Sequence, residues 1–439
     1  MIIITVSAII INGYFRFGGD FLKFLLDTAY KKRILDIAAV LFAFGFLIRL
    51  IAAIGYINEY DTLWYREWAL ALPDGLFDVY ARAEEISLDY PPVLLFFLYL
   101  TGLAYRTVGP EWHILTDMAF MKFWPVVFDV LCGLALFVVF KKYSYKTALV
   151  AATLWLFNPT TIFNSSFWGQ TDGMMCLMLL ISFYALEKEK PLLACFLFAL
   201  AGMTKYQALF FTPIFLMELF LRNNPKTFLK GIGVAALTVV GMFLPFMIGA
   251  KDPFLFFQVY LGGQGKYQLC SLNAFNFYGM LGLNWVDDSS RILGPITYNT
   301  VSLGFTVLII LGLLISYFFI KNRNMWVLSF VFMNSLFMFM SRMHERYQFV
   351  VLIFILYAAV KEKNRDLFWC FALTSITTLF NHILPMFHWN TSDWFIDYYY
   401  GQMLVVLSAI NFVVYILTTY ISVKFLMTEP CSDKKEGGE

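Results

Sequence analysis

The chain has 439 residues, of which 60% are hydrophobic, 19% are aromatic and only 14% are charged. Soluble globular domains carry about a quarter charged residues, so this composition excludes a water-soluble fold, and the net charge of +2 gives no basis for binding nucleic acid. Apolar runs long enough to cross about 30 Å of hydrocarbon recur along the whole chain. The sequence therefore predicts an all-α, polytopic membrane protein whose charges lie mostly between the spans.

The N-terminal segment differs from the rest of the chain. Its first dozen residues are apolar but too short to span a membrane, and they lack the basic start and the cleavage site of a signal peptide. The next stretch, FLKFLLDTAYKKR, is typical of an amphipathic helix lying at the membrane surface. We expect an N-terminal segment at 1–33, a single transmembrane domain at 34–425 with large loops at 56–118 and 251–296, and a cytoplasmic tail at 426–439.

About twelve apolar runs are predicted to span the membrane. A further run at 91–109, PPVLLFFLYLTGLAYRTVG, is predicted to be a re-entrant or interfacial hairpin, because counting it as a span would scatter the basic loops over both sides. Without it, about 19 Lys and Arg residues fall on one side against about 10 on the other, which predicts cytoplasmic termini and external large loops. The predicted spans are 34–55, 119–140, 147–164, 172–187, 191–204, 206–221, 229–250, 297–320, 325–341, 347–360, 366–384 and 402–425.

Five polar clusters fall on the predicted outer side of the membrane. In chain order they read NEYDTLWYREWA (58–69), LDYPP (88–92), WGQTDG (168–173), SLNAFN (271–276) and SRMHERYQ (341–348). Because they gather in one leaflet, we expect a polar pocket at the outer mouth of the helix bundle. Gln170 and Asp172 of the third cluster and Asn273 and Asn276 of the fourth are candidate ligands of a substrate.

Two aspartates, Asp61 and Asp89, are candidate catalytic residues. The segment that follows Asp61 has large apolar residues at every fourth position, namely Trp64, Trp68 and Leu72. This spacing predicts a helix lying on the membrane with its aromatic residues facing the bilayer. Asp61 either only caps that helix or acts as a general base in a cavity at the interface. Asp89 precedes two prolines that force an extended turn, so it either ends a loop or is a second catalytic or substrate-orienting carboxylate.

Cationic side chains predict where an anion would bind. Lys205 and Gln207 lie where one apolar run meets the next, and Lys205 either extends its charge to the interface or pairs with an anion. SRMHERYQ contains Arg342, His344 and Arg346 around a single acid. Since guanidinium offers a planar fork of donors, these residues would bind a phosphate well, although a structural salt-bridge cluster is the alternative. A zinc site is not expected, because only two other histidines share the predicted face.

Together these residues indicate transfer of a group from a lipid-phosphate donor that is embedded in the bilayer. Carboxylates would abstract a proton, the cations would hold the phosphate leaving group, and aromatic rings would stack on a sugar. A transporter or lipid flippase, an oligosaccharide polymerase or ligase, and a scaffold are the alternatives, although the internal repeats that transporters show are not visible. The candidate stacking residues are Trp64, Trp68, Tyr90 and Trp168.

The sequence resembles the GT-C superfamily of polytopic glycosyltransferases. Four features carry the resemblance, namely DTLWYREW, LDYPP, TKYQALFFTPIF and MHERY, and they cover residues 56–350. The most similar members are the dolichyl-phosphate-glucose-dependent glucosyltransferases of the endoplasmic reticulum and their prokaryotic relatives, including mannosyltransferase-like proteins. WGQTDG resembles the prokaryotic members and departs from the eukaryotic enzymes.

The resemblance implies a metal-independent, inverting transfer of glucose or mannose from a polyprenyl phosphate to a glycan, lipid or protein acceptor. It implies that Asp61 is the base, with Asp89 left open as a second candidate, and that Gln170 and Asp172 orient sugar hydroxyls. His344 and Arg346, with Lys205 as a weaker candidate, would stabilise the leaving phosphate. We expect no cofactor, although three aspartates could gather around a divalent ion. We expect a prokaryotic cell membrane with the active site outside, or the lumen of the endoplasmic reticulum in a eukaryote.

Overall fold

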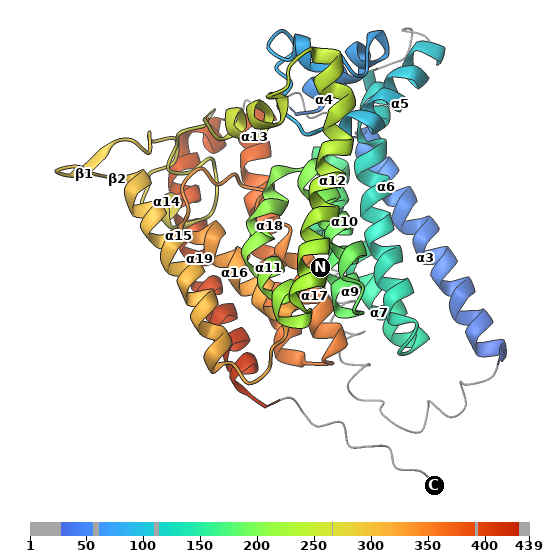
Figure 1. Ribbon diagram of the computed structural model, residues 1–439, viewed down its shortest axis with the longest axis vertical. Helices are drawn as coiled ribbons and strands as arrows, with labels where there is room; N and C mark the ends of the chain where they lie inside the picture. Colours follow the sequence, from blue (N-terminus) through green and yellow to red (C-terminus); the bar gives the residue numbers. More distant parts are fainter. Residues whose placement is uncertain (1–27, 56–60, 109–113, 266, 391–393, 430–439) are drawn as a thin grey trace. The chain divides into compact units, whose positions relative to one another are not determined.

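The computed structural model describes residues 28–55, 61–108, 114–265, 267–390 and 394–429 (Figure 1). Of these residues 78% are helical and very few are in strands, which confirms the prediction of an all-α polytopic membrane protein. Four described helices are apolar but have only 10–17 residues: Pro92–Val108, Pro191–Thr204, Met325–Phe339 and Val351–Lys361. Six described helices are long and apolar enough to cross a membrane: Lys31–Gly55, Ala119–Phe140, Pro225–Ala250, Tyr298–Phe319, Arg365–Trp389 and Tyr398–Met427.

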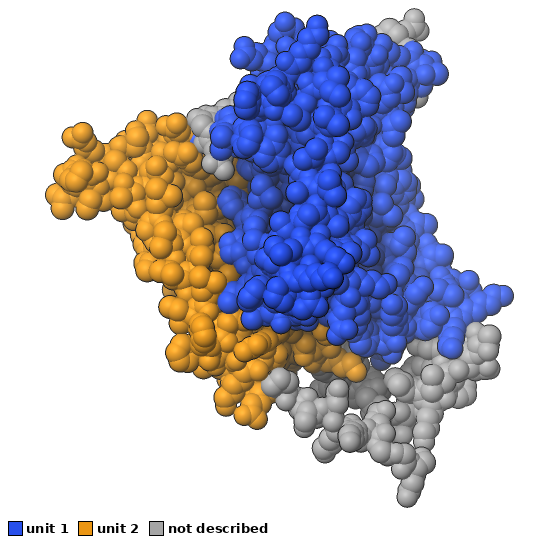
Figure 2. Space-filling view, viewed as in Figure 1, with its two compact units in different colours: residues 1–267, 382–393 blue, residues 268–381, 394–439 orange. Residues whose placement is uncertain are grey.

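The chain forms two compact units, which Figure 2 colours separately. Unit 1 comprises residues 1–267 and 382–393, and unit 2 comprises residues 268–381 and 394–439. The helix α18, Arg365–Asn390, passes from unit 2 into unit 1 at His382. The single transmembrane domain predicted for residues 34–425 stays a prediction.

Unit 1 is a bundle in which α3 packs on α6 and α7, α6 on α9, and α10 on both α9 and α12 (Figure 1). The helices α4 and α5 pack on each other at one end of this bundle. The α-helices of unit 1 are α3 Thr28–Gly55, α4 Asp61–Ala71, α5 Pro92–Val108, α6 Ile114–Phe140, α7 Tyr145–Leu156, α8 Pro159–Ile162, α9 Asp172–Glu187, α10 Pro191–Thr204, α11 Thr212–Arg222, α12 Pro225–Ala250 and α13 Leu255–Gly265. Short 3₁₀ helices lie at Leu72–Asp74, Val79–Arg82 and Tyr206–Phe211, and a π-helix lies at Phe163–Trp168.

Capping residues followed by proline set where several helices begin. Asn158 and Asn224 each precede a proline, and their side-chain oxygens accept hydrogen bonds from backbone N–H groups at 2.9 Å. Proline suits the first helical position because the N–H that it lacks would have no partner there. As a consequence, the span predicted at 147–164 is interrupted at Asn158 and continues as α8 and the π-helix. Likewise, the span predicted at 206–221 begins as a 3₁₀ turn and becomes α-helical only at Thr212.

The hairpin predicted at 91–109 is wrong, because these residues form the single helix α5. Pro92 is its first residue, and the rest of the run is strongly apolar. Gly102 lies in the middle without ending the helix, and a side chain there would collide with the backbone carbonyl of Ala69 in α4. Glycine is therefore needed for the close approach of α5 to α4 and not for a turn.

Unit 2 contains two short apolar helices, α16 and α17, that are almost entirely buried. Almost every residue of α16 and α17 is buried, as expected for helices that are apolar on all sides. In contrast, α15 exposes most of its apolar surface. The elements of unit 2 are α14 Phe277–Met280, β1 Arg291–Leu293, β2 Ile296–Thr297, α15 Tyr298–Phe319, α16 Met325–Phe339, α17 Val351–Lys361, the first part of α18, and α19 Trp394–Met427. The strands β1 and β2 pair antiparallel as a small hairpin.

Some predictions fall outside the described residues. They include most of the N-terminal segment, the residues directly before Asp61 and most of the C-terminal tail. The last residues of the predicted interfacial helix, from Thr28 onward, belong to α3.

Candidate active site

Asp61 is the first residue of α4 and is half-buried. Its Oδ2 accepts two hydrogen bonds, one from Nε1 of Trp168 at 2.7 Å and one from Nε2 of Gln170 at 2.6 Å. Its Oδ1 makes no hydrogen bond to any described residue. One oxygen is therefore fixed by two donors, while the other is left to accept a proton from a ligand.

The π-helix and the glycine after it present these two donors. The wide turn of the π-helix ends at Trp168, and Gly169 follows with φ of +82°, a conformation that L side chains rarely adopt. The N–H of Gln170 then returns to the carbonyl of Asn164 at 2.9 Å. Both side chains are completely buried. Single π turns inside helices recur at functional sites, and here the turn directs Trp168 and Gln170 to the same oxygen.

A chain of hydrogen bonds continues from Gln170 to a buried ion pair. Lys205 donates from Nζ to Oε1 of Gln170 at 3.1 Å and to Oδ1 of Asp172 at 2.6 Å. Nδ2 of Asn164 donates to the other oxygen of Asp172 at 2.9 Å. Because an ammonium only donates, Lys205 fixes the amide of Gln170 with its NH₂ group toward Asp61. The prediction that Lys205 pairs with an anion is confirmed, since its side chain and that of Asp172 are 2% and 5% exposed.

Tyr90 lies beside this chain of hydrogen bonds, and Asp89 directly precedes it in LDYPP. The ammonium of Lys205 lies 5.8 Å from the centre of the Tyr90 ring, and the hydroxyls of Tyr65 and Tyr90 are 3.0 Å apart. Tyr80 donates its hydroxyl to the carbonyl of Tyr90 at 2.7 Å. Burial raises the pKa of Tyr80 well above its usual value, and the charges of Tyr260 and Asp89 raise it further. Tyr80 therefore stays protonated and holds the LDYPP turn.

The buried side of α4 differs from the prediction. Thr62, Tyr65, Trp68 and Ala69 are buried, whereas Trp64 is 43% exposed. The indole of Trp68 donates to the carbonyl of Ile86 at 2.8 Å and packs at 5.3 Å from the ring of Tyr90. Trp64 and Trp68 thus differ in burial although they lie one helical turn apart, and the prediction that this helix faces the bilayer with its aromatic residues stays a prediction.

Gln207, the remaining candidate of unit 1, is buried in the 3₁₀ helix Tyr206–Phe211. Its Oε1 has no hydrogen-bond partner among the described residues. A buried amide oxygen of this kind is costly unless a ligand or a water donates to it. Gln207 therefore stays a candidate for substrate binding.

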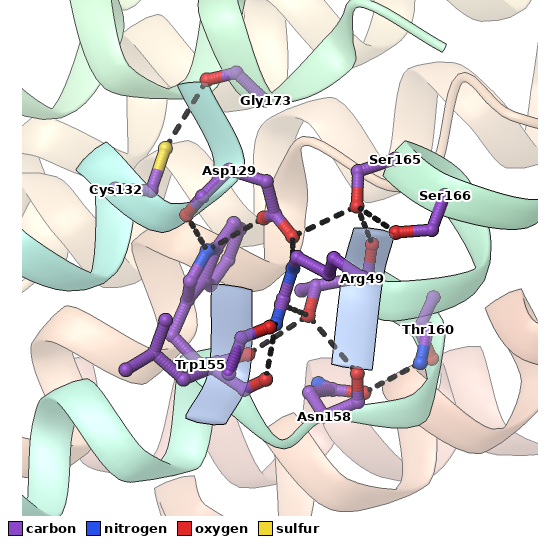
Figure 3. Close-up of polar contacts among 12 residues, drawn as sticks. Arg49, Asp129, Cys132, Trp155, Asn158, Thr160, Ser165, Ser166 and Gly173 are labelled. Atoms are coloured by element: carbon purple, nitrogen blue, oxygen red, sulfur yellow. Dashed lines mark hydrogen bonds and ion pairs between the residues drawn. The ribbon is translucent and has the colours of Figure 1, made fainter. Parts of the chain in front are cut away.

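A buried ionic cluster supports the π-helix from below (Figure 3). Arg49 of α3 and Asp129 of α6 form an ion pair at 2.6 Å with no exposed surface on either side chain. Asp129 also accepts from the indole of Trp155 at 2.8 Å and from the hydroxyl of Ser165, in the π-helix, at 3.1 Å. Arg49 donates to Thr161 Oγ1 at 3.1 Å. The cluster thus joins α3 and α6 to the segment that ends at Trp168.

Lys122 of α6 holds the other end of the π-helix. Its side chain is fully buried, and Nζ donates to the carbonyl of Phe167 at 2.9 Å. A Cβ atom added to Gly169 would lie 2.8 Å from Cγ of Lys122 and 3.3 Å from Cγ2 of Thr62. Sequence reasoning missed Arg49, Lys122 and Asp129. The signal was available, because a charged residue inside an apolar run marks a candidate site with a partner.

In unit 2 the cationic cluster divides between two acids, Glu345 and Asp288. Arg346 NH1 lies 2.7 Å from Glu345 Oε1, and Nδ1 of His344 lies 3.9 Å from Glu345 Oε2. Glu345 is fully buried, while His344 and Arg346 are each 14% exposed. Arg342 instead pairs with the buried Asp288, with its Nε 2.7 Å from Oδ2. The expectation of three cations around one acid is therefore met by only two.

Asn273 and Asn276 support the loop before α14. Oδ1 of Asn273 accepts from Asn284, Trp285 and Tyr400 at 2.9, 2.9 and 2.7 Å. Asn276 caps α14, since its Oδ1 accepts from the N–H of Gly279 at 2.9 Å. Nδ2 of Asn273 is buried and has no hydrogen-bond partner among the described residues, so Asn273, like Gln207, stays a candidate ligand of a substrate. The role of Asn276 in binding a substrate stays a prediction.

No three His, Cys, Asp or Glu side chains in the described part of the chain are placed to hold a metal ion together. Asp61 and Asp172 are each held by nitrogen donors of the same hydrogen-bonded chain. The expectation that no cofactor is needed stays a prediction.

The helical membrane fold and the polar site at Asp61 agree with a membrane glycosyltransferase of the GT-C type, as the resemblance implied. Residues 89–341 match the model of glycosyltransferase family 87, and the chain belongs to this family. The match begins at Asp89, so it contains Trp168, Gln170 and Lys205 but not Asp61. Family membership sets aside the transporter, flippase and scaffold alternatives.

Two curated relatives are both named GPI mannosyltransferase 1. The protein of Saccharomyces cerevisiae is 29% identical over 122 residues, which are 26% of this chain and 30% of the relative. The protein of Dictyostelium discoideum is 26% identical over 174 residues, which are 39% of this chain and 36% of the relative. The chain thus spans about a third of the length of the curated relatives that it matches.

Proposed function

We propose that this protein transfers a hexose from a polyprenyl-phosphate donor to an acceptor hydroxyl at the outer face of the membrane, with inversion and with Asp61 as the general base. The observation that carries the proposal is the unequal use of the Asp61 carboxylate. Trp168 and Gln170 fix Oδ2, whereas Oδ1 has no partner among the described residues. The names of the two relatives favour mannose over glucose.

In the proposed reaction, Oδ1 of Asp61 takes the proton of the acceptor hydroxyl while the hydroxyl oxygen attacks the anomeric carbon. The bond between that carbon and the phosphate oxygen breaks, and the polyprenyl phosphate leaves with the electron pair. A positioned general base is typically worth about 10²- to 10⁴-fold in rate. Its efficiency depends on geometry, and the two donors on Oδ2 supply a fixed orientation.

The same contacts support positioning roles for three other candidates. A chain of hydrogen bonds runs from Asp172 through Lys205 and Gln170 and ends at Asp61. We therefore assign them to holding Asp61 and not to the sugar hydroxyls or the phosphate. Asp89 and Tyr90 are proposed as substrate contacts beside this chain.

His344 and Arg346 are proposed as ligands of the donor phosphate. The fully buried Glu345 accepts a hydrogen bond from Arg346 at 2.7 Å and lies 3.9 Å from Nδ1 of His344, and both cationic candidates keep part of their surface exposed. Arg342 is left out of this role because its guanidinium pairs with Asp288. Charge-assisted hydrogen bonds from such groups would stabilise the phosphate as it leaves. The proposed reaction needs no metal or cofactor.

The proposal is tested by measuring transfer from short-chain polyprenyl-phosphate mannose and glucose to glycan, lipid and peptide acceptors in nanodiscs. In Asp61→Asn the amide oxygen can still accept from Trp168 and Gln170, so folding and donor binding are expected to persist. The rate is expected to fall roughly 10²- to 10⁴-fold. Turnover close to wild type in this variant would remove Asp61 from the mechanism, and inactivity of the wild type with both donors would reject the donor class.

A further inference from the structure

The segment from Leu281 to Thr297 in unit 2 exposes large apolar side chains. The β1–β2 hairpin pairs Leu293 with Ile296, and Gly294 adopts φ of +55° in the two-residue turn between them. This segment carries five large side chains that are about half exposed or more: Leu281 at 53%, Trp285 at 51%, Ile292 at 48%, Leu293 at 75% and Ile296 at 43%. Such a concentration of exposed apolar side chains in a short segment marks a site of interaction with a protein or a membrane.

The hairpin leads directly into a membrane-spanning helix. Thr297 ends β2 and caps α15, whose first residue is Tyr298. In Figure 1 the hairpin projects sideways from the end of α15. The apolar surface of α15 is itself exposed, with Leu303 at 58%, Val307 at 55% and Leu308 at 64%. The exposed surface of the hairpin therefore adjoins the exposed apolar surface of a helix that is long and apolar enough to cross a membrane.

The base of the hairpin is fixed to the turn that carries His344. Asp288 is 1% exposed and accepts from Arg342 and from Ser341, and its carbonyl accepts from the N–H of Asn299 at 2.8 Å. In the nearby segment 271–276, the backbone of Leu272 forms an isolated β-bridge with the backbone of His344. The ion pair of Arg342 thus connects the hairpin rigidly to residues 341–344.

We propose that residues 281–297 form an interfacial anchor that inserts its apolar side chains among the lipid headgroups next to α15. Removing these side chains from water favours insertion, and tryptophan prefers the level of the headgroups. A bilayer is a better occupant than a protein because the adjoining helix α15 is long and apolar enough to cross a membrane and exposes large apolar side chains along its length, from Leu303 to Phe319. Arg342 holds the base of this segment through its ion pair with Asp288.

The test places a fluorophore at the tip of the hairpin. The described cysteines are all buried, so a Cys431→Ser background leaves an introduced cysteine as the site of labelling. Leu293→Cys is labelled with the environment-sensitive dye NBD in the full chain in nanodiscs, and lipids carry nitroxides at the headgroup, at a shallow carbon or at a deep carbon. Ser289→Cys is the matched control, because Ser289 is exposed in the same loop and is polar.

We expect blue-shifted emission at position 293 and stronger quenching by headgroup and shallow nitroxides than by deep ones, with a smaller shift and weaker quenching at position 289. Equal, water-like emission at both positions would overturn the anchor. Blue-shifted emission without quenching by any nitroxide lipid would also overturn it, because protein and not lipid would then cover the hairpin. Neither outcome depends on transferase activity, so this test is separate from that of Asp61.

Discussion

Changing Trp168 to phenylalanine removes one of the two donors on Asp61 and keeps an aromatic ring. A hydrogen bond to a charged group is worth about 1.5–3 kcal/mol, so we expect kcat to fall roughly 10- to 100-fold if the bond orients the base during transfer. Steady-state kinetics of sugar transfer measure this effect. Trp64→Phe is the matched control, because Trp64 lies on the exposed side of α4, and equal losses in the two variants would contradict the role of Trp168.

Variants of the buried ion pair between Lys205 and Asp172 distinguish an effect on stability from an effect on transfer activity. Lys205→Met leaves a buried carboxylate without its cation, which is expected to cost roughly 3–5 kcal/mol of unfolding free energy. Asp172→Asn in the same chain removes that charge, so thermal denaturation in detergent is expected to show partial recovery. Transfer activity is expected to stay low in both variants, because Gln170 has lost the donor that orients its amide.

Recovery of activity together with stability in the double variant would mean that Lys205 serves only the fold. An unchanged melting temperature in Lys205→Met would contradict the buried ion pair itself.

At this scale the sequence predicts much of the site but not how its residues are used. Asp61, Trp168, Gln170 and Lys205 were all selected, because polar residues at the ends of apolar runs are unusual. Their mutual hydrogen bonds were not foreseen, since residues more than 100 positions apart meet only through tertiary packing. Asp288 was missed because an exposed-looking loop sequence, VDDSS, gives no sign that its second aspartate is buried.

Among the elements, the π-helix depends on one glycine. Gly169→Ala would place a side chain at φ of +82° and 2.8 Å from Cγ of Lys122. We expect a loss of roughly 1–3 kcal/mol in stability from the strained backbone and a loss of transfer activity, because Trp168 and Gln170 flank the turn. Thermal denaturation and transfer kinetics measure the two effects.

Gly304→Ala is the control for that substitution. Gly304 lies in α15, and nothing lies within 4 Å of an added Cβ. Alanine there is expected to be neutral or to stabilise by about 0.5–1 kcal/mol. If Gly169→Ala behaves in the same way, the turn does not need its left-handed conformation.

Element positions were predicted well where apolar runs have clear ends. The runs at 172–187 and 191–204 were predicted with the limits that α9 and α10 have, because charged turns and Pro191 bound them. The hairpin predicted at 91–109 is wrong because the number of charges in the loops does not show whether an apolar run is a continuous helix. Gly102 and the apolar side chains around it belong to a continuous helix that packs on α4.

For the whole molecule, orientation in the membrane follows from the basic loops and stays a prediction. In unit 1, α9 begins at Asp172 beside the Asp61 site and ends at Glu187, so the exposed Glu189 lies at the opposite end from the site. The exposed Glu84 lies in the segment that packs on α4. The positive-inside rule places Glu189 in the cytoplasm and Glu84 outside.

Cysteines at these two positions, in the Cys431→Ser background, are expected to respond oppositely to a membrane-impermeant maleimide. Glu84→Cys should react in intact cells, whereas Glu189→Cys should react only after permeabilisation. The reverse pattern would place the site on the cytoplasmic side and would exclude an external acceptor.

The ion pair between Arg49 and Asp129 has a consequence for biogenesis. Either charge alone in the middle of a lipid-exposed helix costs about 2.5–3.5 kcal/mol on insertion scales, and α3 is made long before α6 leaves the ribosome. We therefore expect α3 to stay in contact with the insertion machinery until α6, which carries Asp129, has been synthesised. Both helices would then enter the bilayer with Arg49 and Asp129 as a neutral pair. A nascent chain stalled before residue 129 would remain in contact with that machinery, and one stalled well beyond it would be released.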